Sequence, residues 1–452
     1  MKRVALVTTV TLALLGGATA LFGQVQRERA TGPELVVQER PADLARALLP
    51  NTEKLFDGYV RDGKMPGIVG AFGVGDGPTL FIASGRIADG PTAAPADADS
   101  LWRVYSMTKP VTAFAAMLLI EDGKLKLDQP IGDFLPGFKT MRVLTSPDTS
   151  LASRPATTPI TVRHLLTHTA GLGYSIITKG PLLKEYERLG ILPGAVDART
   201  EAQARLVRPK TLQEFATRVS TLPLIAEPGT KWSYSIGLDV MGAVIERASG
   251  MPFDRFVQQR VFAPLGMRSS FWTVPVGDAP RLATNYAFVG DTRVPVDPGR
   301  GSLWLKPPSF PYGGAGLVMS ARDYDRFLHM LADGGTLDGV RVAKPATVAT
   351  MMSNLLPAGV VFAGIGGGTG GTQAVAPMGY GAGGSVYLKD GPGGFPAKGT
   401  YGWGGAAGTI AFVDPAKRFR ATVMVNYMPP EKWPVRAELS RALAADAARL
   451  GR

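Results

Sequence analysis

The amino-acid sequence predicts an α+β fold: an antiparallel sheet built from both termini and flanked by helices, with a mostly helical region inserted between its strands. Near the N-terminus, residues 68–74 and 80–84 alternate around a turn, which is typical of a β-hairpin. Near the C-terminus, residues 409–413 and 419–427 form a second pair of strand-like segments. Helical periodicity dominates between the two pairs. Since all these strands would share one sheet, the termini are expected to lie close together.

The helices are predicted from apolar spacing and end signals. The strongest is closed by Asp122-Gly123, Gly250 stops another, and Ser320 caps a third. One helix is predicted to end at residue 61. The other helices are predicted over 41–49, 107–121, 161–167, 211–220, 238–249, 252–261, 320–331 and 436–450. Irregular loops are predicted over 86–99, 139–159, 175–210 and 357–399.

The elements divide the chain into three parts. Residues 24–138 and 300–452 are expected to form the sheet domain, and residues 139–299 the inserted helical domain. Residues 1–23 read as a secretory signal peptide, with a basic start, an apolar stretch and an Ala-x-Ala site. We therefore expect an exported protein, periplasmic or secreted. A retained N-terminal anchor is the alternative, and the one expected route to a membrane.

Composition excludes several kinds of chemistry. With 45% hydrophobic and 19% charged residues, the 452-residue chain can bury a core. The net charge is +12, but Lys and Arg are dispersed, so no nucleic-acid partner is expected. The absence of cysteine excludes disulfides, thiolate metal sites and cysteine nucleophiles. The histidines are His164, His168 and His329, without an H-E-x-x-H motif, so we expect no metal site and no cofactor.

The sharpest chemical signal is the tetrapeptide S-M-T-K at 106–109, followed at once by Pro110. Proline inside a helix would break it, so the tetrapeptide must lie in the first helical turn. Ser106 then sits at or near the N-cap, where free N–H groups favour an oxyanion, and Lys109 lies on the same face. A partly desolvated lysine there can accept the serine proton. A Ser N-cap beside a solvated lysine is the alternative.

Two further motifs carry candidate site residues. Tyr234 lies in W-S-Y-S, directly before the helix at 238–249, where it can deliver a phenol into a cleft. The alternative is a buried aromatic whose hydroxyl bonds to backbone. Trp403 lies in Y-G-W-G-G, whose glycines enter the strand at 409–413 and suggest close approach of a backbone or ligand. The alternative is a plain glycine-rich turn.

Together and in this order, the three motifs resemble those of the serine β-lactamase-like superfamily. The chain most closely resembles family VIII carboxylesterases, relatives of class C β-lactamases and DD-peptidases, and the resemblance covers roughly residues 45–450. Supporting stretches are L-L-T-H-T-A-G-L at 165–172, Y-S-I-G-L-D-V-M-G at 234–242, P-L-G-M at 264–267 and G-G-A-G-L at 313–317.

The resemblance implies an acyl-enzyme mechanism without a metal or cofactor. It implies that Ser106 is the nucleophile, that Lys109 is its base partner, and that Tyr234 relays the proton to the leaving group. It also implies a structural role for His168 at a helix end. The oxyanion and substrate-binding residues would be Ser106, Trp403, Gly404, Gly405 and Ala406, with the N–H groups of Ser106 and Ala406 holding the oxyanion.

Two departures from class C β-lactamases bear on the substrate. Ile236 replaces the Asn of Tyr-x-Asn, and Trp403-Gly404-Gly405 replaces Lys-Thr-Gly. The lost lysine removes a charge that binds the β-lactam carboxylate, whereas tryptophan favours uncharged esters. The sequence therefore predicts an exported serine hydrolase of carboxylic esters, with a small-molecule ester or amide as its partner. The alternatives are a β-lactamase or DD-peptidase (penicillin-binding protein), an acyltransferase, a D-amino acid amidase, a non-catalytic cell-wall binding protein and an envelope-attached scaffold.

Overall fold

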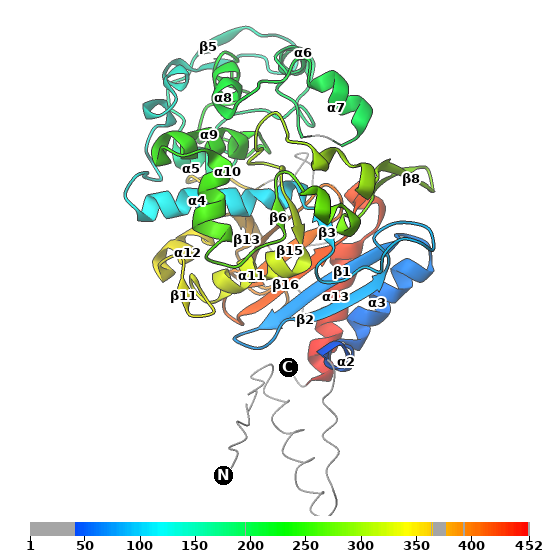
Figure 1. The fold of residues 1–452 in the computed structure, drawn as a ribbon. Helices are drawn as coiled ribbons and strands as arrows, with labels where there is room; N and C mark the ends of the chain where they lie inside the picture. The colour runs from blue at the N-terminus through cyan, green and yellow to red at the C-terminus, as the bar shows by residue number, and fades with distance from the viewer. Residues whose placement is uncertain (1–40, 195, 363, 365–376, 392–393, 451–452) are drawn as a thin grey trace, which may run out of the picture.

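The structure is a computed structural model that describes residues 41–194, 196–362, 364, 377–391 and 394–450. The predicted signal peptide at 1–23 lies outside the described residues. One seven-stranded sheet, antiparallel throughout, dominates the fold (Figure 1). In spatial order its strands are β12 (Met378–Tyr380), β13 (Ser385–Tyr387), β14 (Tyr401–Gly404), β15 (Ile410–Asp414), β16 (Phe419–Met424), β1 (Gly67–Val74) and β2 (Leu80–Gly85).

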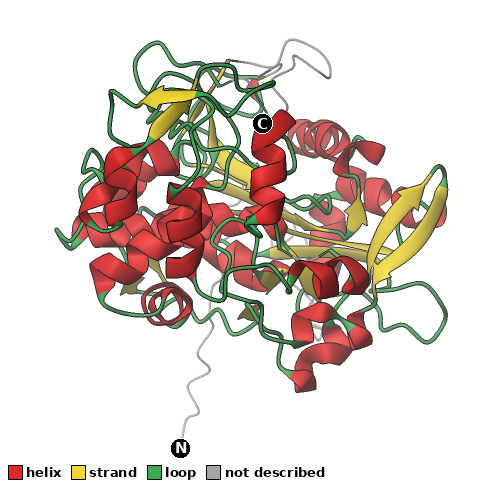
Figure 2. Ribbon diagram, turned by 90° about the horizontal axis from the view of Figure 1, so that it is seen from above, coloured by secondary structure: helices red, strands yellow, loops and turns green. Residues whose placement is uncertain are grey.

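The sheet joins the two ends of the chain, because β1 pairs with β16. Alternate residues of β1 are buried on opposite faces: Ile68 and Phe72 in one apolar cluster, Val69 and Ala71 in another. The predicted antiparallel sheet built from both termini is thus confirmed. Figure 2 shows helices to either side of the strands.

The first face is covered by the terminal helices α2 (Pro41–Leu48), α3 (Pro50–Arg61) and α13 (Val435–Arg449). The carboxylate of Asp446, on α13, accepts the backbone N–H groups of Asn51 and Thr52 at 2.9 and 3.0 Å. It thereby caps the first turn of α3, where N–H groups lack helical partners. Helices α3 and α13, near the two ends of the described chain, therefore lie side by side, as predicted for the termini.

The second face is covered by α4 (Thr108–Glu121), α11 (Ala321–Ala332) and α12 (Pro345–Met351). Helix α4 crosses the middle of the molecule between the sheet and the inserted helices (Figure 1). Almost every one of its residues is buried, including Lys109. The inserted region contains α5 (Val162–Leu166), α8 (Leu212–Ser220), α9 (Gly237–Ser249) and α10 (Phe253–Val257), and α4 packs on α9. The division at residues 138 and 299 stays a prediction.

The helix boundaries follow the predicted end signals. Gly250 ends α9 in the left-handed conformation with φ 71°, and Ser320 caps α11 by accepting the Asp323 N–H at 3.1 Å. Three predicted loops were wrong. The loop at 139–159 contains a hairpin of β4 (Arg142–Leu144) and β5 (Ser153–Pro155), and the insertion at 175–210 contains α6 (Gly180–Arg188) and α7 (Ala198–Ala204). The described part of 357–399 contributes β12 and β13 to the main sheet.

Smaller elements complete the chain. The turn at 401–405 does not merely enter a strand, because 401–404 is itself β14 and pairs with β15. The 3₁₀ turn η1 (Tyr105–Met107) carries Ser106. The other strands and the one π-helical turn are β3 (Leu101–Arg103), β6 (Ser270–Phe271), β7 (Asn285–Val289), β8 (Thr292–Asp297), β9 (Val318–Ser320), β10 (Thr336–Leu337), β11 (Val340–Arg341), β17 (Tyr427–Met428) and the turn at Gln258–Phe262 of the described residues.

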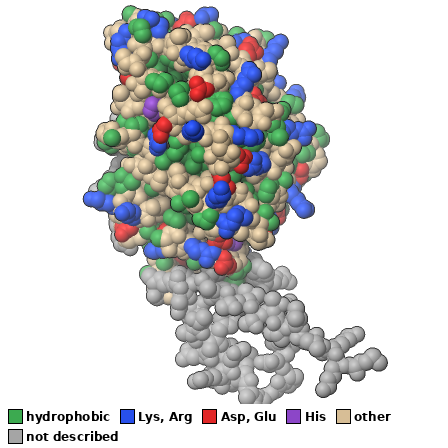
Figure 3. Space-filling view, turned by 90° about the vertical axis from the view of Figure 1, so that its left-hand side faces the viewer, with side chains coloured by type: hydrophobic (Ala, Val, Ile, Leu, Met, Phe, Trp, Pro, Cys, Tyr) green, Lys and Arg blue, Asp and Glu red, His purple; other side chains and the backbone are tan. Residues whose placement is uncertain are grey.

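Surface properties bear on the expected partners. On the face in Figure 3, Lys and Arg side chains are scattered among acidic and uncharged ones rather than gathered. Among the helices of the described residues, none combines the length and apolarity needed to cross a membrane.

Candidate active site

Ser106 lies in the 3₁₀ turn η1, between β3 and the first turn of α4. The side chain is partly exposed, whereas its neighbours Tyr105 and Met107 are buried. Tyr105 has a φ of 42°, a left-handed conformation that costs a non-glycine residue roughly 1–3 kcal/mol. Strain of this kind persists only where the surrounding structure enforces it, so the turn that presents Ser106 is held in place.

Buried contacts provide that restraint. The guanidinium of Arg103, at the end of β3, is fully buried and donates from Nε to Asp297 at 2.7 Å. The backbone N–H of Arg103 donates to Asn426 Oδ1 at 3.1 Å. On the helix side, the Tyr324 hydroxyl donates to the Met107 carbonyl at 2.9 Å. The segment that carries Ser106 is therefore anchored on both sides.

Ser106, Lys109 and Tyr234 meet in one cluster. The Tyr234 hydroxyl lies 2.6 Å from Ser106 Oγ, and Lys109 Nζ lies 3.2 Å from the same oxygen. Lys109 is fully buried, and its Nζ lies 4.6 Å from the centroid of the Tyr234 ring. Two groups able to move a proton thus touch one accessible hydroxyl, which is the arrangement an activated serine requires.

A buried carboxylate supports the lysine through one glycine. Lys109 Nζ donates to the Gly314 carbonyl at 2.7 Å, and the Gly314 N–H donates to Asp239 Oδ1 at 2.8 Å. A Cβ at position 314 would lie 2.6 Å from Asp239 Oδ2, so glycine is required there. Burial raises the pKa of Asp239 to about 6, although the nearby charge of Lys109 and the Gly314 N–H oppose the rise.

A histidine packs under the tyrosine. The His168 ring lies 4.9 Å from the Tyr234 ring, and its Nδ1 accepts the Ser235 N–H at 3.2 Å. Burial and the charge of Lys109 hold the pKa of His168 well below its ordinary value, so the ring is neutral at physiological pH. His168 therefore fixes the position of Tyr234 but contacts neither Ser106 nor Lys109 through a hydrogen bond.

Aromatic side chains form a wall beside Tyr234. The Trp403 ring lies 5.8 Å from the Tyr234 ring and 5.2 Å from the Tyr380 ring. Phe362 and Trp232 extend the wall, with their rings 4.7 Å apart. Trp403 therefore lies beside Tyr234 in apolar surroundings, and its role in substrate binding stays a prediction.

The end of β14 comes close to the nucleophile turn. A Cβ at Gly405 would lie 2.4 Å from the Val104 carbonyl oxygen, two residues before Ser106. This close approach of another backbone confirms the reason predicted for the glycine. A Cβ at Gly404 would instead meet Arg436 of α13, so Gly404 contributes only backbone. Among the hydrogen bonds of the described residues, none uses the N–H of Ser106 or of Ala406, so both are free to hold an oxyanion.

The comparisons with known proteins agree with this geometry. The β-lactamase family model matches residues 52–445. The chain belongs to the β-lactamase family. It is 32% identical to Esterase EstB of Burkholderia gladioli, over 84% of this chain and 91% of EstB, and 30% identical to the lovastatin esterase of Penicillium rubens, over 78% and 86%. The solved structure of EstCE1, described as a hydrolase with promiscuous acyltransferase activity, superposes with a TM-score of 0.72 at 27% identity, covering 88% of this chain and 99% of EstCE1.

Membership confirms the predicted superfamily, and the chain is a serine hydrolase of the β-lactamase family. The individual catalytic roles stay predictions. Three residues of the site were missed by sequence reasoning. Asp239 and Gly314 lie in motifs quoted only for the resemblance, and Tyr380 lies in a segment predicted as a loop. The order of the family motifs was the available signal for Asp239 and Gly314.

The carboxylate beside the lysine gives a pH-dependent stability. Between about pH 4 and 6 the folded enzyme holds the Asp239 proton and the unfolded chain does not, so stability falls as pH rises, by up to about 3 kcal/mol. Asparagine does not ionise, so the Asp239→Asn variant does not lose this stability as the pH rises. We expect urea unfolding to show that the variant is more stable than the wild type at pH 7, with a smaller difference at pH 4.5. The exposed Asp57→Asn is the control, and a pH-independent difference for Asp239→Asn would contradict the assignment.

A methyl group at position 405 should disturb the oxyanion site. Gly405→Ala would push on Val104 and on the Thr409 hydroxyl, which would lie 2.3 Å from the new Cβ. We expect kcat on an activated ester to fall by about 10²–10³, the usual effect of losing an oxyanion donor. Gly277→Ala is the matched control, because its Cβ would meet nothing within 4 Å. An unchanged kcat in a folded Gly405→Ala enzyme would rule out this role.

Among the described residues, one group of side chains outside the site has metal-ligating types. Asp76, His329 and Asp333 offer ligand atoms within 4.8 Å of one another. However, the Arg418 guanidinium donates to Asp76 at 2.6 Å and also contacts Asp333. A cation therefore already sits between the two carboxylates, and these residues do not make a metal centre.

Proposed function

We propose that the chain is an exported enzyme that hydrolyses carboxylic esters through an acyl-enzyme on Ser106. The observation that carries the proposal is the contact of Ser106 Oγ with both Tyr234 Oη and Lys109 Nζ. The names of EstB and the lovastatin esterase support ester substrates. Export is supported by the signal-peptide pattern of residues 1–23.

In the proposed mechanism, Lys109 acts as the free amine: Ser106 Oγ attacks the ester carbonyl carbon while its proton passes to the lone pair of Lys109 Nζ. The negative charge that develops on the carbonyl oxygen is held by the N–H groups of Ser106 and Ala406. As the tetrahedral intermediate collapses and its C–O bond breaks, Tyr234 donates its proton to the leaving oxygen, which releases the alcohol. Water attacks the acyl-enzyme with the same groups acting in reverse, which releases the acid and regenerates Ser106.

The apolar wall argues for esters over β-lactams. Trp403 occupies the place of the lysine that would hold a β-lactam carboxylate, and Ile236 is buried in the core where class C enzymes present an amide. Neither position offers a charge to the carboxylate of a lactam, and Ile236 offers no hydrogen bond to its ring substituents. Ester hydrolysis uses only Ser106, Lys109, Tyr234 and backbone N–H groups, so it is unaffected by the two replacements.

A substrate panel tests the proposal. The purified protein is assayed on p-nitrophenyl butyrate, on a chromogenic cephalosporin and on a D-Ala-D-Ala peptide. We expect the highest kcat/KM on the ester, and turnover of the cephalosporin or the peptide alone would overturn the assignment. Recovery of the protein in the periplasm or medium without residues 1–23 tests export.

Acyl transfer is a second candidate, because EstCE1 is described as a hydrolase with promiscuous acyltransferase activity. Adding a primary alcohol to the ester assay separates the two outcomes. A new ester product, at the expense of free acid, would establish transfer.

A further inference from the structure

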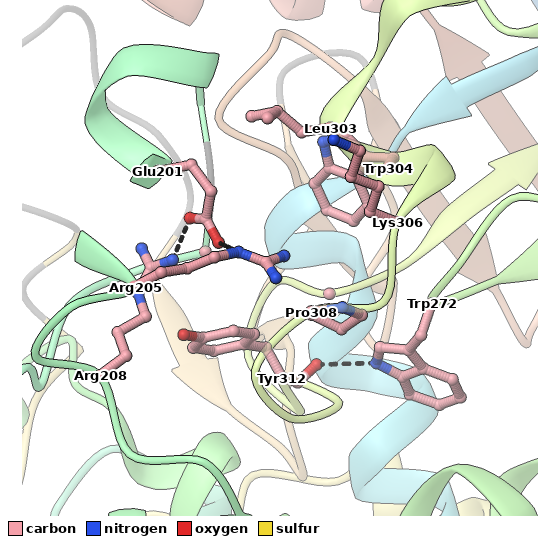
Figure 4. Close-up of a pocket in the computed structure, with 11 residues that line it drawn as sticks. Glu201, Arg205, Arg208, Trp272, Leu303, Trp304, Lys306, Pro308 and Tyr312 are labelled. Carbon is pink, nitrogen blue, oxygen red and sulfur yellow. Dashed lines mark hydrogen bonds and ion pairs between the residues drawn. The ribbon is translucent and has the colours of Figure 1, made fainter. Parts of the chain in front are cut away.

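A cavity lined by cationic side chains lies between the end of α7 and the segment 303–316 (Figure 4). Its volume is about 30 Å³, which has room for one small polar group rather than for a whole substrate. The lining residues used here are Glu201, Arg205, Arg208, Trp304, Lys306 and Tyr312. We call it the Arg205–Tyr312 cavity.

Two contacts join this cavity to the catalytic centre. The Trp304 ring packs edge-on against Tyr105, the residue before Ser106, with centroids 5.9 Å apart. Tyr312 begins the turn whose Gly314 carbonyl accepts the hydrogen bond of Lys109. Trp304, which lines the cavity, therefore touches the turn that presents the nucleophile, and Tyr312 is continuous with the turn that holds Lys109.

The cavity carries more positive than negative charge. Glu201 is its one lining carboxylate, and both of its oxygens are engaged, Oε1 by Arg205 Nε at 2.7 Å and Oε2 by Arg208. Arg205, Arg208 and Lys306 thus bring three cations against a single carboxylate. Arg208 and Glu201 are almost fully buried, whereas Arg205 and Lys306 are exposed, so the excess positive charge lies at the rim of the cavity.

Unused hydrogen-bond donors point to the same kind of ligand. Arg208 Nε, the Tyr312 hydroxyl and Trp304 Nε1 are buried and have no partner among the described residues. The Tyr312 and Trp304 side chains are only 5% and 8% exposed. Burial raises the pKa of Tyr312, so its hydroxyl stays protonated at neutral pH. Buried donors without acceptors are costly, and a group that only accepts hydrogen bonds would satisfy them.

We propose that the Arg205–Tyr312 cavity binds a carboxylate carried by the substrate of Ser106, so that the enzyme prefers anionic esters to neutral ones. The inference rests on the proposed ester hydrolysis and names its substrate class. It revises the expectation, drawn from Trp403, that the substrate is uncharged. The positive charge lost at Trp403 is present instead on the side of α7.

The test compares matched esters. Mono-p-nitrophenyl glutarate carries a free carboxylate on its acyl part, and its methyl ester is the neutral control. We expect a kcat/KM at least about tenfold higher for the free acid, as for hydrogen bonds to a charged group. The preference should shrink as NaCl rises to about 0.5 M, because salt screens charges at the rim. A parallel pair, 4-carboxyphenyl butyrate and phenyl butyrate, shows whether the alcohol part carries the carboxylate instead.

Two variants locate the effect. Tyr312→Phe removes one hydroxyl, and Arg205→Met removes a partly exposed cation without breaking the buried Arg208–Glu201 pair. Each should lower the ratio of the two kcat/KM values several-fold. Arg199→Met, an exposed arginine on α7 outside the cavity, should leave the ratio unchanged. Equal kcat/KM values for anionic and neutral esters in the wild type, or a ratio that the variants do not alter, would overturn the inference. Failure to hydrolyse any ester would instead overturn the proposed function.

Discussion

Replacing Ser106 by alanine is expected to lower the kcat for ester hydrolysis by about 10⁴–10⁶, the largest effect of any single substitution in this enzyme. The change removes the oxygen that Tyr234 and Lys109 both contact. It fills no space and leaves Tyr105 and Met107 in their buried positions, so the fold should persist. Steady-state assays on p-nitrophenyl butyrate measure the loss.

The matched control is Ser146→Ala, a serine on the exposed loop between β4 and β5. It should retain full activity. If Ser106→Ala hydrolysed esters at the wild-type rate, the acyl-enzyme mechanism would be wrong. Thermal unfolding of both variants separates loss of chemistry from loss of structure.

The second large effect is expected at the proton relay. Lys109→Met keeps the length and apolar stem of a fully buried side chain but removes Nζ, and Tyr234→Phe removes only the hydroxyl. Each should lower kcat by about 10²–10⁴, the usual share of general acid–base catalysis. Because the two groups act on one oxygen, the double variant should lose little more than the worse single variant.

A surface lysine provides the control for the relay. Lys124 is exposed just after the end of α4, and Lys124→Met should leave kcat unchanged. Additive losses in the Lys109→Met/Tyr234→Phe double variant would show that the two residues act in separate steps, against the shared contact seen here. Rapid-mixing experiments that follow the p-nitrophenolate burst report acylation directly.

The elements that the sequence predicts best are those whose boundary residues lie within or directly beside the element. The helix expected at 107–121 is α4 at Thr108–Glu121, because Pro110 and Asp122-Gly123 mark its ends in the sequence itself. Strands β12 and β13 were missed because three-residue strands show no alternation and form only by pairing with β14, as a contact between distant segments. Helices α6 and α7 are short, and their scattered charges hide the apolar face.

In the active site too, contacts between residues close in the sequence are predictable and contacts between distant segments are not. The 106–109 motif brings Ser106 and Lys109 together within one helical turn, which the sequence alone predicts. The bridge from Lys109 through Gly314 to Asp239 joins segments 75 and 205 residues apart, so no local pattern reveals it. The contact of His168 with Tyr234 likewise joins separate segments, because it depends on how α5 and the turn before α9 pack.

The most direct test of the central claim is intact-protein mass spectrometry of the purified enzyme, with and without a fluorophosphonate, followed by peptide mapping. We expect one stoichiometric adduct, on Ser106, because among the described residues that hydroxyl alone lies in contact with both Tyr234 and Lys109. Labelling should be lost in Ser106→Ala and slowed in Lys109→Met. An adduct on another residue, or none on Ser106, would contradict the claim that this cluster is an activated serine.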